Sequence, residues 1–318
     1  MASIRRKRTE ALASNNDTGF GSNASGYGGR FVNKDGSFNV KIEGASFTQR
    51  LSVYHSMLNM PRRKFALAIV LFFVLINILF TCIYVAMGAD NFAGFVATTE
   101  WGKIKELYFF STETFTTVGY GRINPVGDGV NLVASFEAML GFLSFAIATG
   151  LIYGRFAKPR AYVVFSEHAV IAPFHDKLGL MFRVAPYKNG HILTDVQIRV
   201  TMAMQIEEDG KLTARFYTLT LERNRVDSLM MNWTVVHPLD EDSPLYGYTP
   251  DDMKNADVEI YVLLRGFDEV YANTVQRRTS YTFDEIVHNA KFLPMYHESE
   301  DGKTTIFELN KLNHYQQL

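Results

Sequence analysis

The stretch IKELYFFSTETFTTVGYGRINP, residues 104–125, decides the fold, because its two halves favour different backbones. The first half reads as a short helix. The second half holds TTVGYG, residues 116–121, with three hydroxyl side chains and two glycines but no acid, histidine or cysteine. An enzyme loop normally carries a base or a nucleophile, whereas a loop that works through its backbone carbonyls needs neither. The stretch therefore predicts a short helix that runs into an extended loop whose useful groups are peptide oxygens.

Two apolar blocks flank this stretch, and each is long enough to cross a bilayer. The block from Phe65 to Met87 holds no charged residue, and the block from Leu132 to Gly154 holds only Glu137. Because about 20 helical residues span the hydrocarbon core, both blocks predict transmembrane helices. The helix within residues 104–121 is too short to cross, so it must enter and return. Non-helical backbone tolerates that depth only where it is buried in protein or lines water.

Glu137 is the only charged residue inside these two blocks. An ionised carboxylate that faces lipid costs about 2.5–3.5 kcal/mol, so Glu137 must face protein or water. Two roles remain open for it. One is a hydrogen-bonded structural contact behind the loop, which we favour, and the other is a group that attracts cations.

Basic residues flank both blocks on the same side of the membrane. They are Arg62, Arg63 and Lys64 before the first block, and Arg155, Lys158 and Arg160 after the second. Under the positive-inside rule, both termini lie on the cytoplasmic side of a cell membrane, as for a protein of the bacterial inner membrane. Such residues accompany any membrane span, but two clusters at adjacent helix ends can also bind an anionic lipid headgroup, at about 1 kcal/mol per basic residue.

The chain before the first block divides into three segments. Residues 1–29 are rich in Asn, Gly and Ser and predict a disordered tail. Residues 30–45 predict a cytoplasmic strand with Asp35–Gly36 as its turn. Residues 46–61 predict a helix that lies in the membrane interface, and residues 62–157 form the transmembrane pore region.

Residues 158–298 predict an immunoglobulin-like β-sandwich, because apolar residues alternate along several short segments. Two such sets each occupy one face of a strand: Val196, Ile198, Val200 and Met202, and Val258, Ile260, Val262 and Leu264. Thr249 followed by Pro250 predicts the start of a helix. Residues 299–318 are left as a C-terminal tail.

The TTVGYG loop is suited to holding a dehydrated monovalent cation. The oxygens that can replace the water shell of the cation are the carbonyls of Thr117, Val118, Gly119 and Tyr120, with the Thr117 hydroxyl. Gly119 and Gly121 permit backbone angles that other residues resist. One chain supplies too few oxygens to surround an ion, but four chains around an axis supply enough. The loop therefore predicts a homotetramer with its pore on the symmetry axis.

TTVGYG between two spans resembles the signature of potassium channels, and the two-span layout with a large β domain resembles the inward-rectifier family. Further stretches carry the same resemblance: RFVNKDGSFNV (30–40), RFAKPRA (155–161), VFSEHAVIAPF (164–174), LDEDSPLY (239–246) and QRRTSYTFDEI (276–286). The pore loop lacks the flanking cysteines usual in eukaryotic members, so the chain looks like a prokaryotic-type member. The resemblance implies passive K⁺ conduction that is not gated by a voltage sensor.

The resemblance implies that residues 117–121 form the selectivity filter, with Thr116 and Glu113 behind it. An ion pair between Glu113 and Arg122 is the natural proposal for bracing the loop, and the alternative is that Arg122 points into the outer solvent. Phe145 stands where strong rectifiers place an acid, which implies weak block by Mg²⁺ or polyamines. Asp195 and Asp227 are candidate acids of the cytoplasmic pore, although Arg265 occupies another place that is often acidic.

Gating roles follow from the same resemblance. Tyr153 matches the position where four bulky side chains close the pore, and the loop from Gly266 through Ala272 to Thr274 resembles a second, cytoplasmic gate. Gly141 and Gly150 either let the inner helix bend or let a neighbouring element approach. The six basic residues near the membrane are implied to bind a phosphoinositide or another anionic lipid, with the sign of the effect open.

Composition limits the other readings of this chain. The net charge of -1 gives no global attraction to nucleic acid, and the single cysteine, Cys82, excludes internal disulfides and multi-cysteine zinc sites. The sequence lacks GxxxxGK[ST], HExxH and GxSxG, so an enzyme and a bound cofactor are not expected. A membrane-anchored sensor with a closed pore remains an alternative. A transporter subunit is disfavoured, because such chains carry four pore loops.

Overall fold

The computed structural model describes residues 30–44, 46, 52–208 and 211–318. The predicted tail at residues 1–29 and residues 47–51 of the predicted interfacial helix lie outside the described residues. The chain divides into two compact units, one of residues 43–158 and one that joins residues 30–42 to residues 159–318.

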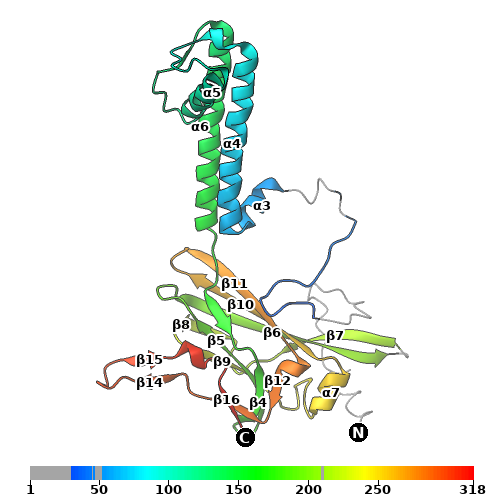
Figure 1. The fold of residues 1–318 in the computed structure, drawn as a ribbon. Helices are drawn as coiled ribbons and strands as arrows, with labels where there is room; N and C mark the ends of the chain where they lie inside the picture. Colours follow the sequence, from blue (N-terminus) through cyan, green and yellow to red (C-terminus); the bar gives the residue numbers. More distant parts are fainter. Residues whose placement is uncertain (1–29, 45, 47–51, 209–210) are drawn as a thin grey trace. The chain divides into compact units, whose positions relative to one another are not determined.

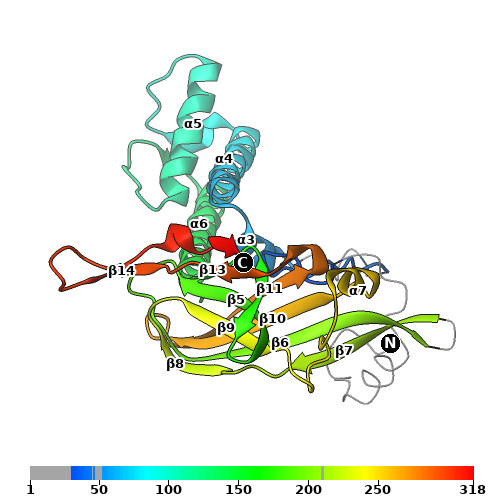
Figure 2. The same ribbon diagram turned by 90° about the horizontal axis from the view of Figure 1, so that it is seen from below.

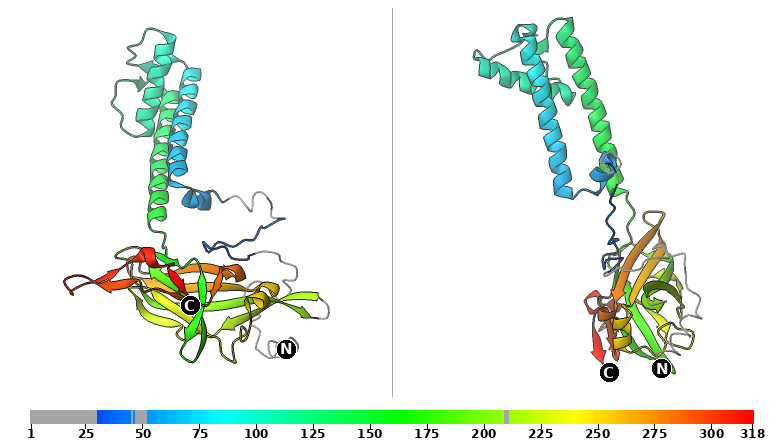
Figure 3. Two further views of the ribbon diagram at one scale, coloured as in Figure 1. Left: turned by 60° about the horizontal axis from the view of Figure 1, so that its bottom comes forward. Right: turned by 90° about the vertical axis from the view of Figure 1, so that its right-hand side faces the viewer.

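The first unit, the pore unit, consists of helices with a small two-stranded sheet (Figures 1 and 3). Its elements are α3 (Val53–Asn59), α4 (Arg62–Met87), η1 (Ala89–Asn91), β1 (Phe92–Ala93), α5 (Glu100–Phe115), β2 (Asn124–Pro125) and α6 (Asp128–Phe156). Both predicted spans are confirmed as helices long and apolar enough to cross a membrane. With 26 and 29 residues, α4 and α6 are about 39 and 43 Å long, which exceeds a hydrocarbon core of about 30 Å.

The short helix α5 begins where the Thr99 side chain accepts a hydrogen bond from the Gly102 amide, at 3.1 Å. This is an N-cap, which satisfies one of the unpaired amides of the first turn. The helix then packs against both long helices through a buried apolar cluster that includes Phe80, Leu107 and Val130. The cluster fixes the end of α5, and therefore the start of the loop that follows it.

The second unit is a β-sandwich, as predicted (Figure 2). One sheet runs β11-β10-β6-β7 with β8 paired to β6, and the other runs β12-β4-β5-β3 with β9 paired to β5. Their bounds are β3 Val163–Phe165, β4 Ala169–Phe174, β5 Lys177–Pro186, β6 Leu193–Glu208, β7 Lys211–Leu219, β8 Arg225–Leu229, β9 Trp233–Pro238, β10 Glu259–Asp268, β11 Asn273–Thr282 and β12 Ile286–His288.

The predicted strand faces form the core between the two sheets. All four alternating residues of β6 and the four from Val258 to Leu264 are buried in the main apolar cluster. The register places them in adjacent strands, with Val262 opposite Val200 and Ile260 opposite Met202. The predicted helix is α7 (Pro250–Asn255), capped by the Thr249 hydroxyl.

Both ends of the chain add to the β unit. Residues 299–318, expected as a tail, instead contain β15 (Thr305–Phe307), η3 (Leu309–Lys311) and β16 (Tyr315–Gln317). β15 pairs with β14 (Tyr296–Glu298), and β16 with β13 (Ala290–Phe292). At the other end, a bridge between Val32 and Phe38 closes the predicted turn, and the Ser280 hydroxyl donates to the Val32 carbonyl at 2.5 Å.

The LDEDSPLY segment is held to β9 by His237. Its Nδ1 lies 2.7 Å from the Thr220 carbonyl, and its Nε2 lies 2.8 Å from the Ser243 hydroxyl. Burial lowers the pKa of His237 below its ordinary value. The imidazole is therefore kept neutral in the folded unit while the unfolded chain still titrates near pH 6.5.

This difference predicts a pH-dependent stability. As pH falls below about 6.5, the unfolded chain takes up a proton that the folded chain does not, so the free energy of unfolding decreases. Between pH 7.5 and 5.5 we expect His237→Gln, which cannot titrate, to lose less Tm than the wild type, by roughly 2–4 °C. Thermal unfolding at the two pH values checks this, and an identical pH dependence in both proteins would contradict it.

Candidate functional site

In the loop after α5, residues with left-handed backbone angles alternate with residues that have ordinary negative φ values. Thr117, Gly119 and Gly121 have φ values of +62°, +56° and +78°, while the two residues between them are not left-handed. We call residues 117–121 the filter strip. Glycine adopts positive φ at little energetic cost, which explains why glycine occupies positions 119 and 121. Thr117 is strained, because L-residues with a side chain seldom adopt this angle.

The amides of the filter strip point back to the pore helix. Val118 N and Gly119 N both donate to the Glu113 carbonyl, at 2.9 and 3.3 Å. In a trans peptide the carbonyl points opposite to the amide of the same plane. The carbonyls of Thr117 and Val118 must therefore point away from α5, both in the same direction. Successive carbonyls in an ordinary strand would instead alternate.

The opposite side of the filter strip is open in the single chain. The Val118 side chain is 53% exposed and that of Tyr120 is 80% exposed. The last turn of α5 ends directly before the strip, and the carboxyl end of a helix carries about half a negative charge. Aligned carbonyls beside a negative helix end favour a cation, and no catalytic side chain stands within the strip.

Arg122 has a different partner from the one predicted. It forms an ion pair with Glu106, at 2.9 Å, and not with Glu113. The reason is the direction of the chain after the filter strip, which returns past the start of α5, where Glu106 lies. Glu113 acts through its backbone carbonyl, and Thr116 donates its hydroxyl to the Thr112 carbonyl at 2.7 Å. Asn124 braces the far end by donating to the Gly121 carbonyl at 2.8 Å.

Glu137 of α6 is fully buried and links this helix to α4 and α5. Its carboxylate accepts hydrogen bonds from the Tyr84 hydroxyl of α4 and from the Ser111 hydroxyl of α5, the latter at 2.5 Å. The buried Asn77 amide oxygen lies 3.0 Å from Ser111. The structural role favoured from the sequence is the one that the structure shows, and we call these four residues the polar clamp.

Gly141 is the point where α6 touches the end of α5. A Cβ atom placed on Gly141 would lie 1.8 Å from the Phe115 carbonyl oxygen and 2.7 Å from its carbon. This glycine therefore serves close packing. Gly150 differs, because a Cβ there would meet no atom within 4 Å. The helix is continuous through both positions.

The candidate pore-gate residues of α6 share one face of the helix. Phe145, Thr149 and Tyr153 follow at four-residue spacing, and the two rings are 74% and 73% exposed. The second candidate gate is the tip of a hairpin, because Gly266 lies within β10 and Ala272 in the turn before β11. There the buried Asp268 carboxylate accepts from two turn amides and contacts His191 Nδ1 at 3.0 Å, a link that the sequence gave no reason to expect.

The two candidate acids of the cytoplasmic pore lie across from one another on β6 and β8. Asp195 and Asp227 fall between the paired residues Thr194–Ser228 and Val196–Val226. Arg225 Nε contacts the Asp195 carboxylate at 2.7 Å. A basic residue therefore offsets the acid that was expected to attract cations.

The membrane-proximal basic residues do not form one free cluster. The Arg155 guanidinium donates to the Met57 and Met60 carbonyls at 2.6 and 2.7 Å, which caps the end of α3. Lys158 donates to the Asn59 side chain at 2.6 Å. The first turn of α4 carries the exposed cations Arg62, Arg63 and Lys64, while Arg160 belongs to the other unit.

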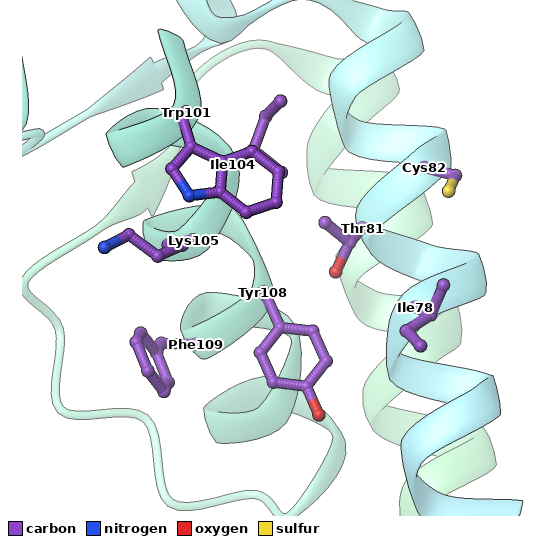
Figure 4. Close-up of a pocket in the computed structure, with 8 residues that line it drawn as sticks. All are labelled: Ile78, Thr81, Cys82, Trp101, Ile104, Lys105, Tyr108 and Phe109. Atoms are coloured by element: carbon purple, nitrogen blue, oxygen red, sulfur yellow. The ribbon is translucent and has the colours of Figure 1, made fainter. Parts of the chain in front are cut away.

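A groove of about 310 Å³ lies between α4 and α5 (Figure 4). Its lining is Ile78, Thr81, Cys82, Trp101, Ile104, Lys105, Tyr108 and Phe109. The lining is mostly apolar, and its polar groups are the side-chain ends of Thr81, Cys82, Lys105 and Tyr108 together with the Trp101 indole N–H. No group of three or more metal-ligating side chains converges within residues 30–44, 46, 52–208 and 211–318.

Comparison with known proteins bears directly on this arrangement. Residues 163–317 match the family described as inward rectifier potassium channel C-terminal domain, and residues 69–158 match the ion channel family. Over 279 residues the chain is 34% identical to the inward rectifier potassium channel Kirbac3.1 of Paramagnetospirillum magnetotacticum, covering 87% of this chain and 92% of that protein.

The chain belongs to the inward-rectifier potassium channel family. Two animal relatives support this membership. Inward rectifier potassium channel 18 of Homo sapiens is 28% identical over 86% of this chain and 67% of its own length. Inward rectifier potassium channel 4 of Mesocricetus auratus is 31% identical over 61% of this chain and 46% of its own length. Inward rectifiers are membrane ion channels, so the pore unit and the β-sandwich are the two parts of a chain of this potassium channel family.

A solved structure, the sporulation control protein Spo0M of Bacillus subtilis, aligns with 41% of this chain and 50% of its own length. Its TM-score is 0.23 at 13% identity, which is too low to inform the fold of this inward rectifier.

Proposed function

We propose that four copies of the chain form a potassium-selective pore, with the filter strips facing one another around the symmetry axis. The observation that carries this proposal is the common direction of the Thr117 and Val118 carbonyls, away from α5. One chain leaves this row of oxygens open on one side, and replacing the hydration shell of an ion needs oxygens on all sides. The exposed apolar surface of α4 and α6 would be covered by lipid and by neighbouring subunits.

Ion flux tests the proposal. The purified chain reconstituted in liposomes should give Ba²⁺-sensitive K⁺ flux. In detergent solution it should have a protein mass of four times 36.1 kDa. We expect Gly119→Ala to abolish the flux, because a φ of +56° is unfavourable for alanine although space for its Cβ exists.

The control is Gly129→Ala on α6, where the added Cβ would make only an ordinary 3.6 Å contact. This variant should conduct like the wild type. Absence of Ba²⁺-sensitive flux from the wild type in every lipid and at every pH would leave the membrane-anchored sensor as the better reading.

We propose that both termini are cytoplasmic and that anionic lipid sets the open probability. The exposed cations at the start of α4, with Arg160, are the groups available for a lipid phosphate, because Arg155 and Lys158 already bind α3. α3 and α6 are linked through these bonds, so lipid bound near α4 can act on the Tyr153 region of α6. Phe145 and the pairing of Asp195 with Arg225 both argue for weak rectification.

Removing the Tyr153 ring separates lipid control from conduction. In liposomes with an increasing fraction of anionic lipid, wild-type flux should change with lipid composition, in a direction that the measurement will establish. Tyr153→Ala should conduct in all compositions with a weaker dependence, because four rings no longer narrow the pore. If this variant kept the full lipid dependence of the wild type, the gate would lie elsewhere.

A further inference from the structure

The outer face of the β6 sheet, opposite the core, carries a basic pocket of about 560 Å³. Three arginines line it, Arg199, Arg225 and Arg265, together with neutral polar side chains that include Thr218, Thr220 and Asn224. None of the lining residues is acidic. Arg265 stands where the family often has an acid of the cytoplasmic pore, so attraction of K⁺ does not account for a cluster of cations here.

The strand register brings these arginines together. On β6 the residues on either side of Gln197 and Arg199 are buried in the core, so these two side chains face outward. Arg265 of β10 and Arg225 of β8 both pair with Gln197, one from each side. Adjacent strands lie about 4.8 Å apart, so the backbones of the two arginines are about 10 Å apart with Gln197 between them.

The charges of this face are not balanced within the chain. Arg225 has one partner, Asp195, which lies outside the pocket lining. In the part of the chain that the structure describes, neither Arg199 nor Arg265 has an ion pair or a hydrogen bond through its side chain. Like charges on neighbouring strands destabilise a sheet. Holding three guanidinium groups around one pocket therefore has a cost that a bound anion would offset.

We propose that this pocket binds a polyphosphate anion of nucleotide size. Guanidinium groups bind phosphate oxygens in a bidentate manner, and three of them spread over three strands suit several linked phosphates better than one. The volume lies within the range of small-molecule sites, and far exceeds what a single phosphate fills. The hydroxyl and amide groups can bind a sugar, and the apolar Leu221 and Leu263 can contact a base.

Binding to the purified full-length chain tests this site, and the assay is independent of conduction because it uses no ion gradient. Isothermal titration without Mg²⁺ should show saturable binding of inorganic tripolyphosphate and of ATP, and much weaker binding of orthophosphate. We expect Arg199→Gln and Arg265→Gln each to weaken tripolyphosphate binding by about tenfold. The tripolyphosphate affinity of Arg265→Lys should lie between those of the wild type and Arg265→Gln, since lysine keeps the charge but loses the bidentate geometry.

The matched control is Arg277→Gln. Arg277 lies on β11 opposite the core residue Leu264, so it points to the other side of the sheet from Arg265. This variant should bind tripolyphosphate like the wild type. Equal affinity of the wild type and the two pocket variants would overturn the proposal. So would arginine-dependent binding to phosphoinositide vesicles without any binding of soluble tripolyphosphate, because the ligand would then be a lipid headgroup.

Discussion

Replacing Gly141 with alanine is expected to prevent assembly of a functional pore. The new Cβ would lie 1.8 Å from the Phe115 carbonyl oxygen and 2.7 Å from the carbonyl carbon, distances that real Cβ atoms do not reach. The obstructing atoms are backbone, so no side-chain rotation relieves the contact. Phe115 ends the helix that carries the filter strip, and the strain must move α5 away from α6. Overpacking of this kind costs about 1–3 kcal/mol or more.

Gly150→Ala is the matched control on the same helix, since its Cβ would meet no atom within 4 Å. The native mass and the thermal stability of both variants in detergent test whether the contact between Gly141 and Phe115 is needed for assembly. We expect Gly141→Ala to lose tetrameric mass and K⁺ flux, and Gly150→Ala to keep the tetramer. A stable tetramer of Gly141→Ala with normal flux would show that the close contact with Phe115 does not matter.

The second large effect is expected for Glu137→Ala, which empties the centre of the polar clamp. The Tyr84 and Ser111 hydroxyls are fully buried, and both would lose their hydrogen bond to the carboxylate. Ser111 would still have the Asn77 oxygens within 3.0 and 3.3 Å, whereas Tyr84 would lose its acceptor. A buried donor without a partner costs about 1–3 kcal/mol and a lost hydrogen bond about 1 kcal/mol, so we expect a loss of about 2–4 kcal/mol of stability. Glu137→Gln keeps the shape and one acceptor oxygen, and should cost less.

Thermal unfolding of the reconstituted chain checks this prediction: the Tm should decrease in the order wild type, Glu137→Gln, Glu137→Ala. This experiment also separates the two roles that the sequence left open for Glu137. A variant with wild-type stability but reduced K⁺ conductance would favour the cation-attracting role over the clamp.

The architecture followed from the sequence because it depends on long and regular patterns. Two long apolar blocks, with Glu137 as their only charged residue, predicted the spans, and period-two alternation from Val196 to Met202 predicted a strand of the sandwich. The polar clamp was also within reach. Asn77, Thr81 and Tyr84 follow at spacings of four and three in an otherwise apolar span, which places them on one helix face, opposite a partner.

The partner of Arg122 could not be chosen from the sequence. Glu106 and Glu113 are seven residues apart, so both lie on the same face of α5, and only the path of the returning chain separates them. The contacts of Arg155 could not be predicted for a related reason, because they depend on where the last carbonyls of α3 lie. The short strands after residue 299 escaped notice, since three residues cannot show a reliable alternation.

The bi-ionic reversal potential of the reconstituted wild-type channel, with K⁺ on one side of the bilayer and Na⁺ on the other, is the most direct test of the filter strip. If carbonyl oxygens from four chains replace the water around K⁺, the reversal potential should be set almost wholly by the K⁺ gradient. Gly119→Ala should carry no current and therefore show no such potential. A reversal potential near zero, with Na⁺ as permeant as K⁺, would contradict the account.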